Sequence, residues 1–184
     1  MERPRASKPG LYLQDPAFKM HGELLSAEAY AAALRRFTTY CVDVLFIDRA
    51  KKKVLLPYRT IKPAQGFWVI GGGVMAGELE IDAIQKHVKN DTSLVLSSSR
   101  FTYLTTNRYI WAEREQELRE AGCDSIGYTF TAELGENERA QATRGMNPNE
   151  YDPERGLTAF DFKGLESAGV HQAIRDMYQL VFNA

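Results

Sequence analysis

The stretch from Arg59 to Leu94 constrains the fold of this 184-residue chain most strongly. It reads RTIKPAQGFWVIGGGVMAGELEIDAIQKHVKNDTSL. A strand expected at Phe67 to Ile70 runs into a glycine triplet at 71–73, and a helix is expected from Leu79 to Asp91. Apolar residues recur at helical spacing in that helix, at Ile81, Ile84 and Val88. Glycine lets the backbone approach a ligand closely, so the unit predicts a site for anionic oxygen and metal.

The remaining elements fit one α/β domain over residues 26–184, preceded by a tail and lead-in at 1–25. A long polar segment, Gly135 to Gly156, is expected to be a functional loop or a structureless one. The other expected elements are a helix from Ala27 to Arg36 capped by Ser26, strands at Thr39–Asp48, Val54–Tyr58, Arg100–Thr106 and Ser125–Leu134, an edge segment at Leu157–Leu165 and a helix at Val170–Phe182.

Two polar features interrupt this apolar pattern. Asp43 stands alone inside an apolar strand, where a carboxylate costs free energy unless it is paired or faces a site. A site role and a structural hydrogen bond are both open for it. The charged segment Glu113 to Glu120 is interpreted as a solvated surface helix or excursion.

Composition excludes several classes of function. A formal net charge of -1 and a pI near 6.3 give no basic field for nucleic acid. Cys41 and Cys123 lack the spacing of a disulfide framework or zinc site. No segment approaches the length of a membrane span or a secretory signal, so we expect a cytoplasmic protein with no membrane partner.

The glycine loop and its helix have the spacing of a Nudix box, G-x5-E-x7-R-E-U-x-E-E-x-G-U with U apolar. Gly72 and Glu78 take its first two fixed positions. The phrase Arg59 to Trp68, RTIKPAQGFW, resembles the RT-x-(K/R)-PAQG-(F/Y)-W of the GDP-mannose mannosyl hydrolase group within that superfamily. The resemblance implies a Nudix-type α/β/α sandwich with a mixed β-sheet, a nucleoside diphosphate derivative as small-molecule ligand, and a homodimer.

The resemblance also implies residue roles. Magnesium, with manganese as an alternative ion, would be held by the Gly71 carbonyl and Asp91 together with diphosphate oxygens and water. Arg59 would contact the diphosphate and Asp43 the sugar hydroxyls, beside the glycine loop at Gly72 and Gly73. Structural support comes from an expected ion pair between Glu78 and Lys86.

The sequence departs from the group at positions that carry its chemistry. The typical box gathers three glutamates on one helix face, and here these positions are His87, Asn90 and Asp91. Gly73 replaces an arginine, and no histidine occurs in the late loop near Glu150. Glu150 is therefore a candidate general base, and His87 is either a base or metal ligand or a packed or solvent-facing histidine.

Two functional hypotheses follow from these observations. The first is a magnesium-dependent hydrolase of a nucleoside diphosphate sugar or related diphosphate. The second is a catalytically impaired protein of the same fold that binds a nucleotide or sugar nucleotide without hydrolysing it. The retained PAQG-W phrase and Asp91 favour the first, whereas the lost carboxylates, Gly73 and the missing histidine favour the second.

Overall fold

The computed structural model describes residues 10–12, 14–15, 17–20 and 22–183. Its main sheet has the strand order β6-β7-β1-β2-β8, and β5 pairs with β1 beside β2. β1 and β7 are parallel and the other pairs are antiparallel, so the sheet is mixed. The strands are β1 Thr39–Asp48, β2 Lys53–Leu56, β5 Ile70–Gly73, β6 Thr102–Trp111, β7 Cys123–Glu133 and β8 Thr158–Phe160, and a separate pair is β3 Tyr58–Arg59 with β4 Gly66–Phe67.

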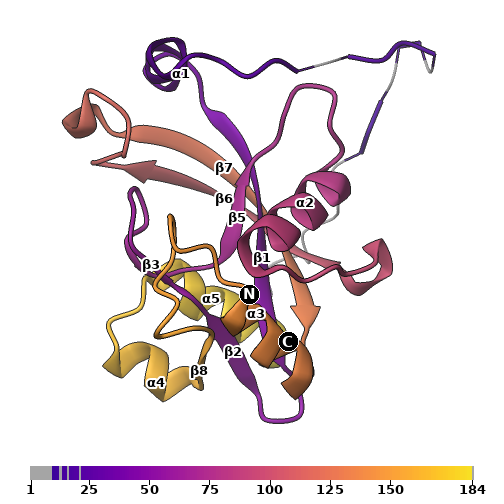
Figure 1. Cartoon of the computed structure of the whole chain (residues 1–184), viewed down its shortest axis with the longest axis vertical. Helices are drawn as coiled ribbons and strands as arrows, with labels where there is room; N and C mark the ends of the chain where they lie inside the picture. Colours follow the sequence, from indigo (N-terminus) through magenta and orange to yellow (C-terminus); the bar gives the residue numbers. More distant parts are fainter. Residues whose placement is uncertain (1–9, 13, 16, 21, 184) are drawn as a thin grey trace, which may run out of the picture.

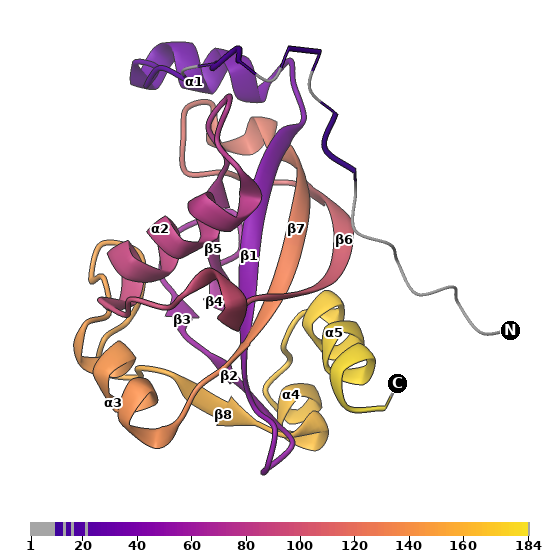
Figure 2. The same cartoon turned by 90° about the vertical axis from the view of Figure 1, so that its right-hand side faces the viewer.

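Helices cover both faces of this sheet, as Figures 1 and 2 show. α2 lies on one face, with α3 at one end of it, and α5 lies on the other face near α4. Their bounds are α1 Ala27–Leu34, α2 Glu80–Thr92, α3 Glu136–Arg144, α4 Phe162–Ser167 and α5 Gln172–Phe182, with short 3-10 turns η1 Ser98–Arg100 and η2 Arg119–Ala121. The prediction of an α/β/α sandwich with a mixed sheet is therefore confirmed.

The alternation of β1 divides the core into two clusters. Val42, Val44 and Phe46 pack into the cluster beneath α2, whereas Leu45 and Ile47 pack into the cluster beneath α5. Successive side chains of a strand point to opposite faces. Asp43 lies between Val42 and Val44 on β1 and therefore belongs to the α5 face of the sheet.

Most of the expected elements are present with shifted ends, but several interpretations were wrong. The edge segment expected at Leu157–Leu165 contains the short strand β8 and the start of α4. The segment from Gly135 to Gly156 was expected to be a loop but contains the helix α3. The Glu138 side chain accepts a hydrogen bond from Gly135 N at 3.0 Å and forms an ion pair with Arg100. The expected strand at 67–70 is divided between β4 and β5, because Trp68 and Val69 turn into the core between them.

The N-terminal helix begins as expected, with Ser26 Oγ accepting a hydrogen bond from Ala29 N at 3.2 Å. The described residues before it expose several large apolar side chains, among them Leu11, Tyr12 and Phe18. The lead-in boundary at residue 25 and the homodimer stay predictions. None of the helices in the described part of the chain is long and apolar enough to cross a membrane.

Candidate active site

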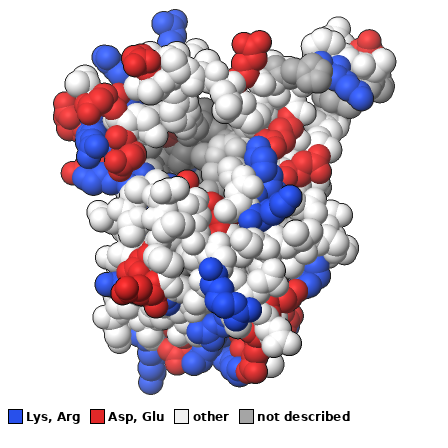
Figure 3. Space-filling model, viewed as in Figure 1, with Lys and Arg blue, Asp and Glu red and all other residues white. Residues whose placement is uncertain are grey.

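A cavity of about 330 Å³ lies between α1 and the segment that joins β6 to β7, over the start of β1 and the glycines of β5. Figure 3 shows a hollow on this face of the molecule, below α1. Seven residues that the sequence analysis assigned to the site line it: Asp43, Arg59, Gly71, Gly72, Gly73, His87 and Glu150. The fold thus gathers residues that lie up to about a hundred positions apart in the chain into one cavity.

The Asp43 carboxylate occupies a slot between two glycines. A Cβ on Gly71 would lie 2.5 Å from Oδ1 of Asp43, and a Cβ on Gly127 would lie 2.7 Å from Oδ2. The residue is only 8% exposed, and its carboxylate receives no hydrogen bond from any described residue. Burial raises the pKa of this carboxyl to about 7, although the positive charge of Arg59 acts in the opposite direction.

The guanidinium of Arg59 is only partly satisfied by the protein. Its Nη2 lies 3.5 Å from Oε2 of Glu150, at the long end of a hydrogen bond. Its Nε is buried and has no hydrogen-bond partner among the described residues. The backbone of Glu150 is better fixed, because its carbonyl accepts hydrogen bonds from Thr60 N at 2.8 Å and Thr60 Oγ1 at 3.0 Å. Arg59 therefore has donor capacity left for a ligand.

His87 projects from α2 across the glycine loop. A Cβ on Gly72 would lie 2.5 Å from Cε1 of the imidazole, so the ring needs a glycine there. Its Nε2 lies 3.0 Å from the carbonyl oxygen of Gly73. Because a carbonyl only accepts hydrogen bonds, Nε2 carries the hydrogen of this bond.

Asp91 lies one turn further along α2 and is buried, 5% exposed, outside the described lining of the cavity. Its Oδ1 accepts a hydrogen bond from the Asn147 side chain at 3.3 Å, and its carbonyl accepts one from Asn147 N at 2.9 Å. Burial raises the pKa of this carboxyl to about 6, and the charge of Glu150 adds to the rise. Asp91 is therefore tied to the loop after α3, a contact that the sequence analysis did not predict.

The donor set does not fit a resident metal centre made by the protein alone. Within the described ranges, His, Cys, Asp and Glu side chains form no group of three or more that could hold a metal ion. Asp91 already bonds Asn147, and Glu150 faces Arg59. Divalent cations bound by oxygen prefer six or more ligands, so most of them would have to come from a bound diphosphate and water.

The glycine loop is braced as expected. Lys86 Nζ lies 2.5 Å from Oε1 of Glu78, while Oε2 of Glu78 accepts a hydrogen bond from Met75 N at 3.0 Å. One carboxylate thus joins the loop to α2 and also satisfies a backbone donor within the loop. The ion pair predicted from the box spacing is present.

The segment from Glu113 to Glu120 is not simply a solvated surface excursion, which corrects the sequence interpretation. Arg114 is fully buried, and its guanidinium donates to the carbonyl oxygens of Gln116 at 3.2 Å and Glu117 at 2.7 Å. This arrangement turns Glu115 and Gln116 toward the cavity. The alternating charges in the sequence EREQELRE gave no indication that Arg114 is buried and that the segment folds around it.

Aromatic side chains form the apolar wall of the cavity. Trp68, Tyr109 and Trp111 line it, with ring centroids 5.4 to 5.5 Å apart. Trp68 belongs to the PAQG-W phrase, but the other two come from β6, which was predicted to end at Thr106. Extending the alternating pattern of β6 to Trp111 would have found them.

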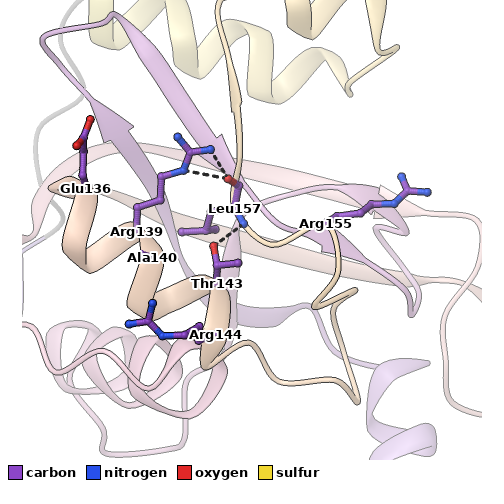
Figure 4. Close-up of a pocket in the computed structure, with 7 residues that line it drawn as sticks. All are labelled: Glu136, Arg139, Ala140, Thr143, Arg144, Arg155 and Leu157. Carbon is purple, nitrogen blue, oxygen red and sulfur yellow. Dashed lines mark hydrogen bonds between the residues drawn. The ribbon is translucent and has the colours of Figure 1, made fainter.

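A second, shallower depression lies beside α3 (Figure 4). Its Arg139 donates from Nε and Nη2 to the Leu157 carbonyl at 3.1 and 2.8 Å, and Leu157 N donates to Thr143 Oγ1 at 3.3 Å. These bonds fasten the chain before β8 to α3. The depression therefore has a structural explanation.

The architecture is similar to that of solved Nudix structures. The chain matches no protein-family model and no curated relative. A MutT Nudix hydrolase from Burkholderia pseudomallei superposes with a TM-score of 0.60, at 18% identity over 79% of this chain and 99% of that one. The E. coli dihydroneopterin triphosphate pyrophosphohydrolase gives 0.52, at 15% identity over 81% and 100% of the two chains. The chain therefore has the fold of the MutT/Nudix hydrolases.

Proposed function

We propose that this protein hydrolyses a nucleoside diphosphate derivative of the nucleotide-sugar kind, GDP-mannose among the candidates, in the cavity around Arg59. The observation that carries the proposal is the partly buried, incompletely satisfied guanidinium of Arg59, which lines the same cavity as Asp43 and the glycine triplet. A planar guanidinium fork suits two phosphate oxygens. Fold neighbours include an enzyme whose name states action on dihydroneopterin triphosphate, which supports a ligand with linked phosphates.

Binding of the diphosphate would change the partner of Arg59. Phosphate oxygens carry more negative charge than the single carboxylate 3.5 Å away, so they compete well for the guanidinium. Glu150 would then face the ligand with a free carboxylate. The hydrogen bonds from Thr60 would keep the backbone of Glu150 in place when the ion pair opens.

Glu150 is the general base of this proposal. It takes a proton from a water molecule as the water oxygen forms a bond to the atom that carries the diphosphate. The bond from that atom to the bridging oxygen breaks, and the diphosphate leaves with the electron pair, stabilised by Arg59. His87 stays beside the glycine triplet, where its Nε2 holds the Gly73 carbonyl.

Magnesium remains a prediction of the family resemblance. The residues with the right chemistry are Asp91 and the Gly71 carbonyl, and the ion would supply charge neutralisation to the leaving diphosphate. Since the described donors do not make a protein-only centre, we derive no step through the ion. Comparing turnover in magnesium, in manganese and in a chelator measures its contribution.

A second candidate function is binding without hydrolysis. The observation that favours it is the state of α2, whose three box carboxylate positions here hold His87, the exposed Asn90 and the buried Asp91. In this case the diphosphate would replace Glu150 as the partner of Arg59, as described above, but the ligand would leave unchanged.

One experiment separates the two functions. The purified chain is incubated with nucleoside diphosphate sugars of several bases, with and without magnesium, and released sugar, nucleotide and phosphate are measured. Thermal unfolding with the same compounds reports binding independently of turnover. Release of product supports the hydrolase, a raised melting temperature without product supports the binding protein, and no response to any compound overturns both.

A further inference from the structure

The innermost part of the cavity is a slot that fits a positive charge. Its floor is the Asp43 carboxylate, 8% exposed, with Gly71 on one side and Gly127 on the other. The ring edge of Tyr109 lies at the same glycine, because Cε2 of Tyr109 is 2.9 Å from the position of a Gly127 Cβ. No described residue donates a hydrogen bond to this carboxylate, so a ligand is its available partner.

Asp43 differs from the other acids that line the cavity. Glu150 lies 3.5 Å from Arg59, and Glu115 lies 3.5 Å from Arg119. Lys62, the other cation of the lining, is paired with Glu113. In the described part of the chain Asp43 has no ion pair, and Arg59 is the one positive charge that acts on it from a distance.

In the proposed function, Asp43 would have even less positive charge near it. When a diphosphate takes the charge of Arg59, the buried Asp43 carboxylate loses its only compensation. A buried carboxylate without a counter-charge is unfavourable and takes up a proton unless a cation is supplied, and the hydroxyl groups of a neutral sugar add hydrogen bonds but no positive charge. A cation supplied by the ligand would restore the balance.

The surroundings of Asp43 suit an ammonium group. The titratable groups that line the cavity around it include Arg59 from β3, Cys41 from β1 and Tyr109 from β6, and of these three only Arg59 is positive. Trp68, Tyr109 and Trp111 give the neighbouring wall an aromatic surface. A carboxylate beside aromatic rings is a favourable environment for an organic cation.

We infer that the group attached to the diphosphate carries an ammonium and that Asp43 binds it, so the ligand is a nucleoside diphosphate linked to an amine-bearing sugar or alcohol. This inference rests on the proposed function for the position of the diphosphate. It assigns Asp43 as the residue that sets specificity, through charge, where the family resemblance implied contacts to neutral hydroxyls.

The test compares ligands that differ in one group. Calorimetry measures the affinity of UDP-glucosamine, UDP-glucose and UDP-N-acetylglucosamine, together with the guanosine series. We expect the free amine to bind about 10-fold or more tightly than the hydroxyl and acetylated counterparts of the same base, because only it forms an ion pair. Equal affinities, or tighter binding of a neutral sugar, would overturn the inference while leaving the proposed function intact.

Two variants show whether Asp43 causes the preference. Asp43→Asn keeps the shape of the side chain and removes its charge, and the ratio between amine and hydroxyl ligands should fall to about one. Asp48→Asn is the matched control, because it makes the same change on the same strand, outside the cavity lining. If Asp43→Asn keeps the preference of the wild type, Asp43 is not the specificity residue. Failure of all ligands to bind the wild type would overturn the proposed function as well.

Discussion

The two ends of α2 differ in how far they agree with the box spacing that the sequence resembles. At the N-terminal end, the Glu78–Lys86 ion pair and the bond to Met75 N hold the glycine loop. At the C-terminal end, Asp91 is buried against Asn147, and the neighbouring box positions hold His87 and Asn90. The contacts that hold the glycine loop therefore belong to the fold. The side chains available for chemistry on α2 are a separate matter. Substitutions at the two kinds of position should therefore differ in what they change.

The largest expected effect is on the frame itself. Gly71→Ala would place a Cβ 2.1 Å from the Val42 carbonyl oxygen and 2.5 Å from Asp43 Oδ1. Because a backbone atom must move, we expect a loss of about 2–4 kcal/mol in the free energy of unfolding, measured in denaturant. Gly73→Ala is the control, since nothing lies within 4 Å of its Cβ position, and it should change stability by less than about 0.5 kcal/mol. Equal effects of the two substitutions would show that the slot is wider than described.

The next largest effect is expected on ligand affinity. Arg59→Met removes the guanidinium and keeps most of the side-chain volume, so the affinity for a nucleoside diphosphate sugar should fall by about 100-fold, or about 2–3 kcal/mol. Calorimetry measures this change. Arg49→Met, at an exposed arginine with a distant 3.8 Å contact to Glu133, should leave the affinity unaltered. Undiminished binding by Arg59→Met would remove Arg59 from the site.

The stability of the protein should depend on pH through Asp43. Its pKa rises from 3.8 in the unfolded chain to about 7 in the folded one, so the folded state holds the proton more tightly. Stability is then lost as pH rises through this interval, and Asp43→Asn should remove the loss. Melting curves of both proteins from pH 4 to 8 measure it. Parallel pH profiles would mean that Asp43 is not protonated more readily on folding.

The smallest effect concerns the brace. Lys86→Met removes the partner of Glu78, but the lysine side chain is 42% exposed, so solvent screens the pair. We expect a loss of less than about 1 kcal/mol in unfolding free energy. Added salt should also lower the unfolding free energy of the wild type slightly, because it screens the pair. A loss larger than about 1 kcal/mol in Lys86→Met would show that the ion pair contributes more to holding the loop.

Much of the fold could be predicted from the sequence, because periodicity and glycine placement fix local structure. The strand predicted from the β-branched and aromatic run of β1 and the helical spacing of α2 were correct, and the box spacing predicted the Glu78–Lys86 pair. The missed parts depend on tertiary contacts. α3 has a weak apolar stripe, and its Arg100 partner is 38 residues away from Glu138.

The site was also predicted only in part. Sequence placed Asp43, Arg59 and the glycine triplet together through the resemblance, and the structure brings them to one cavity. Nothing local in the sequence indicates that Gly127 makes room for Asp43, or that Arg114 is buried and turns Glu115 inward. These are contacts between distant segments, and only the folded chain reveals them.

The central claim is that the cavity turns over a nucleoside diphosphate derivative with Glu150 as base. The most direct measurement is steady-state hydrolysis of a ligand that binds the wild type, compared with Glu150→Gln. We expect product release by the wild type, and a fall in kcat of about 100-fold or more in the variant with little change in KM. Binding of the ligand without product release by the wild type, or equal kcat in both proteins, would contradict it.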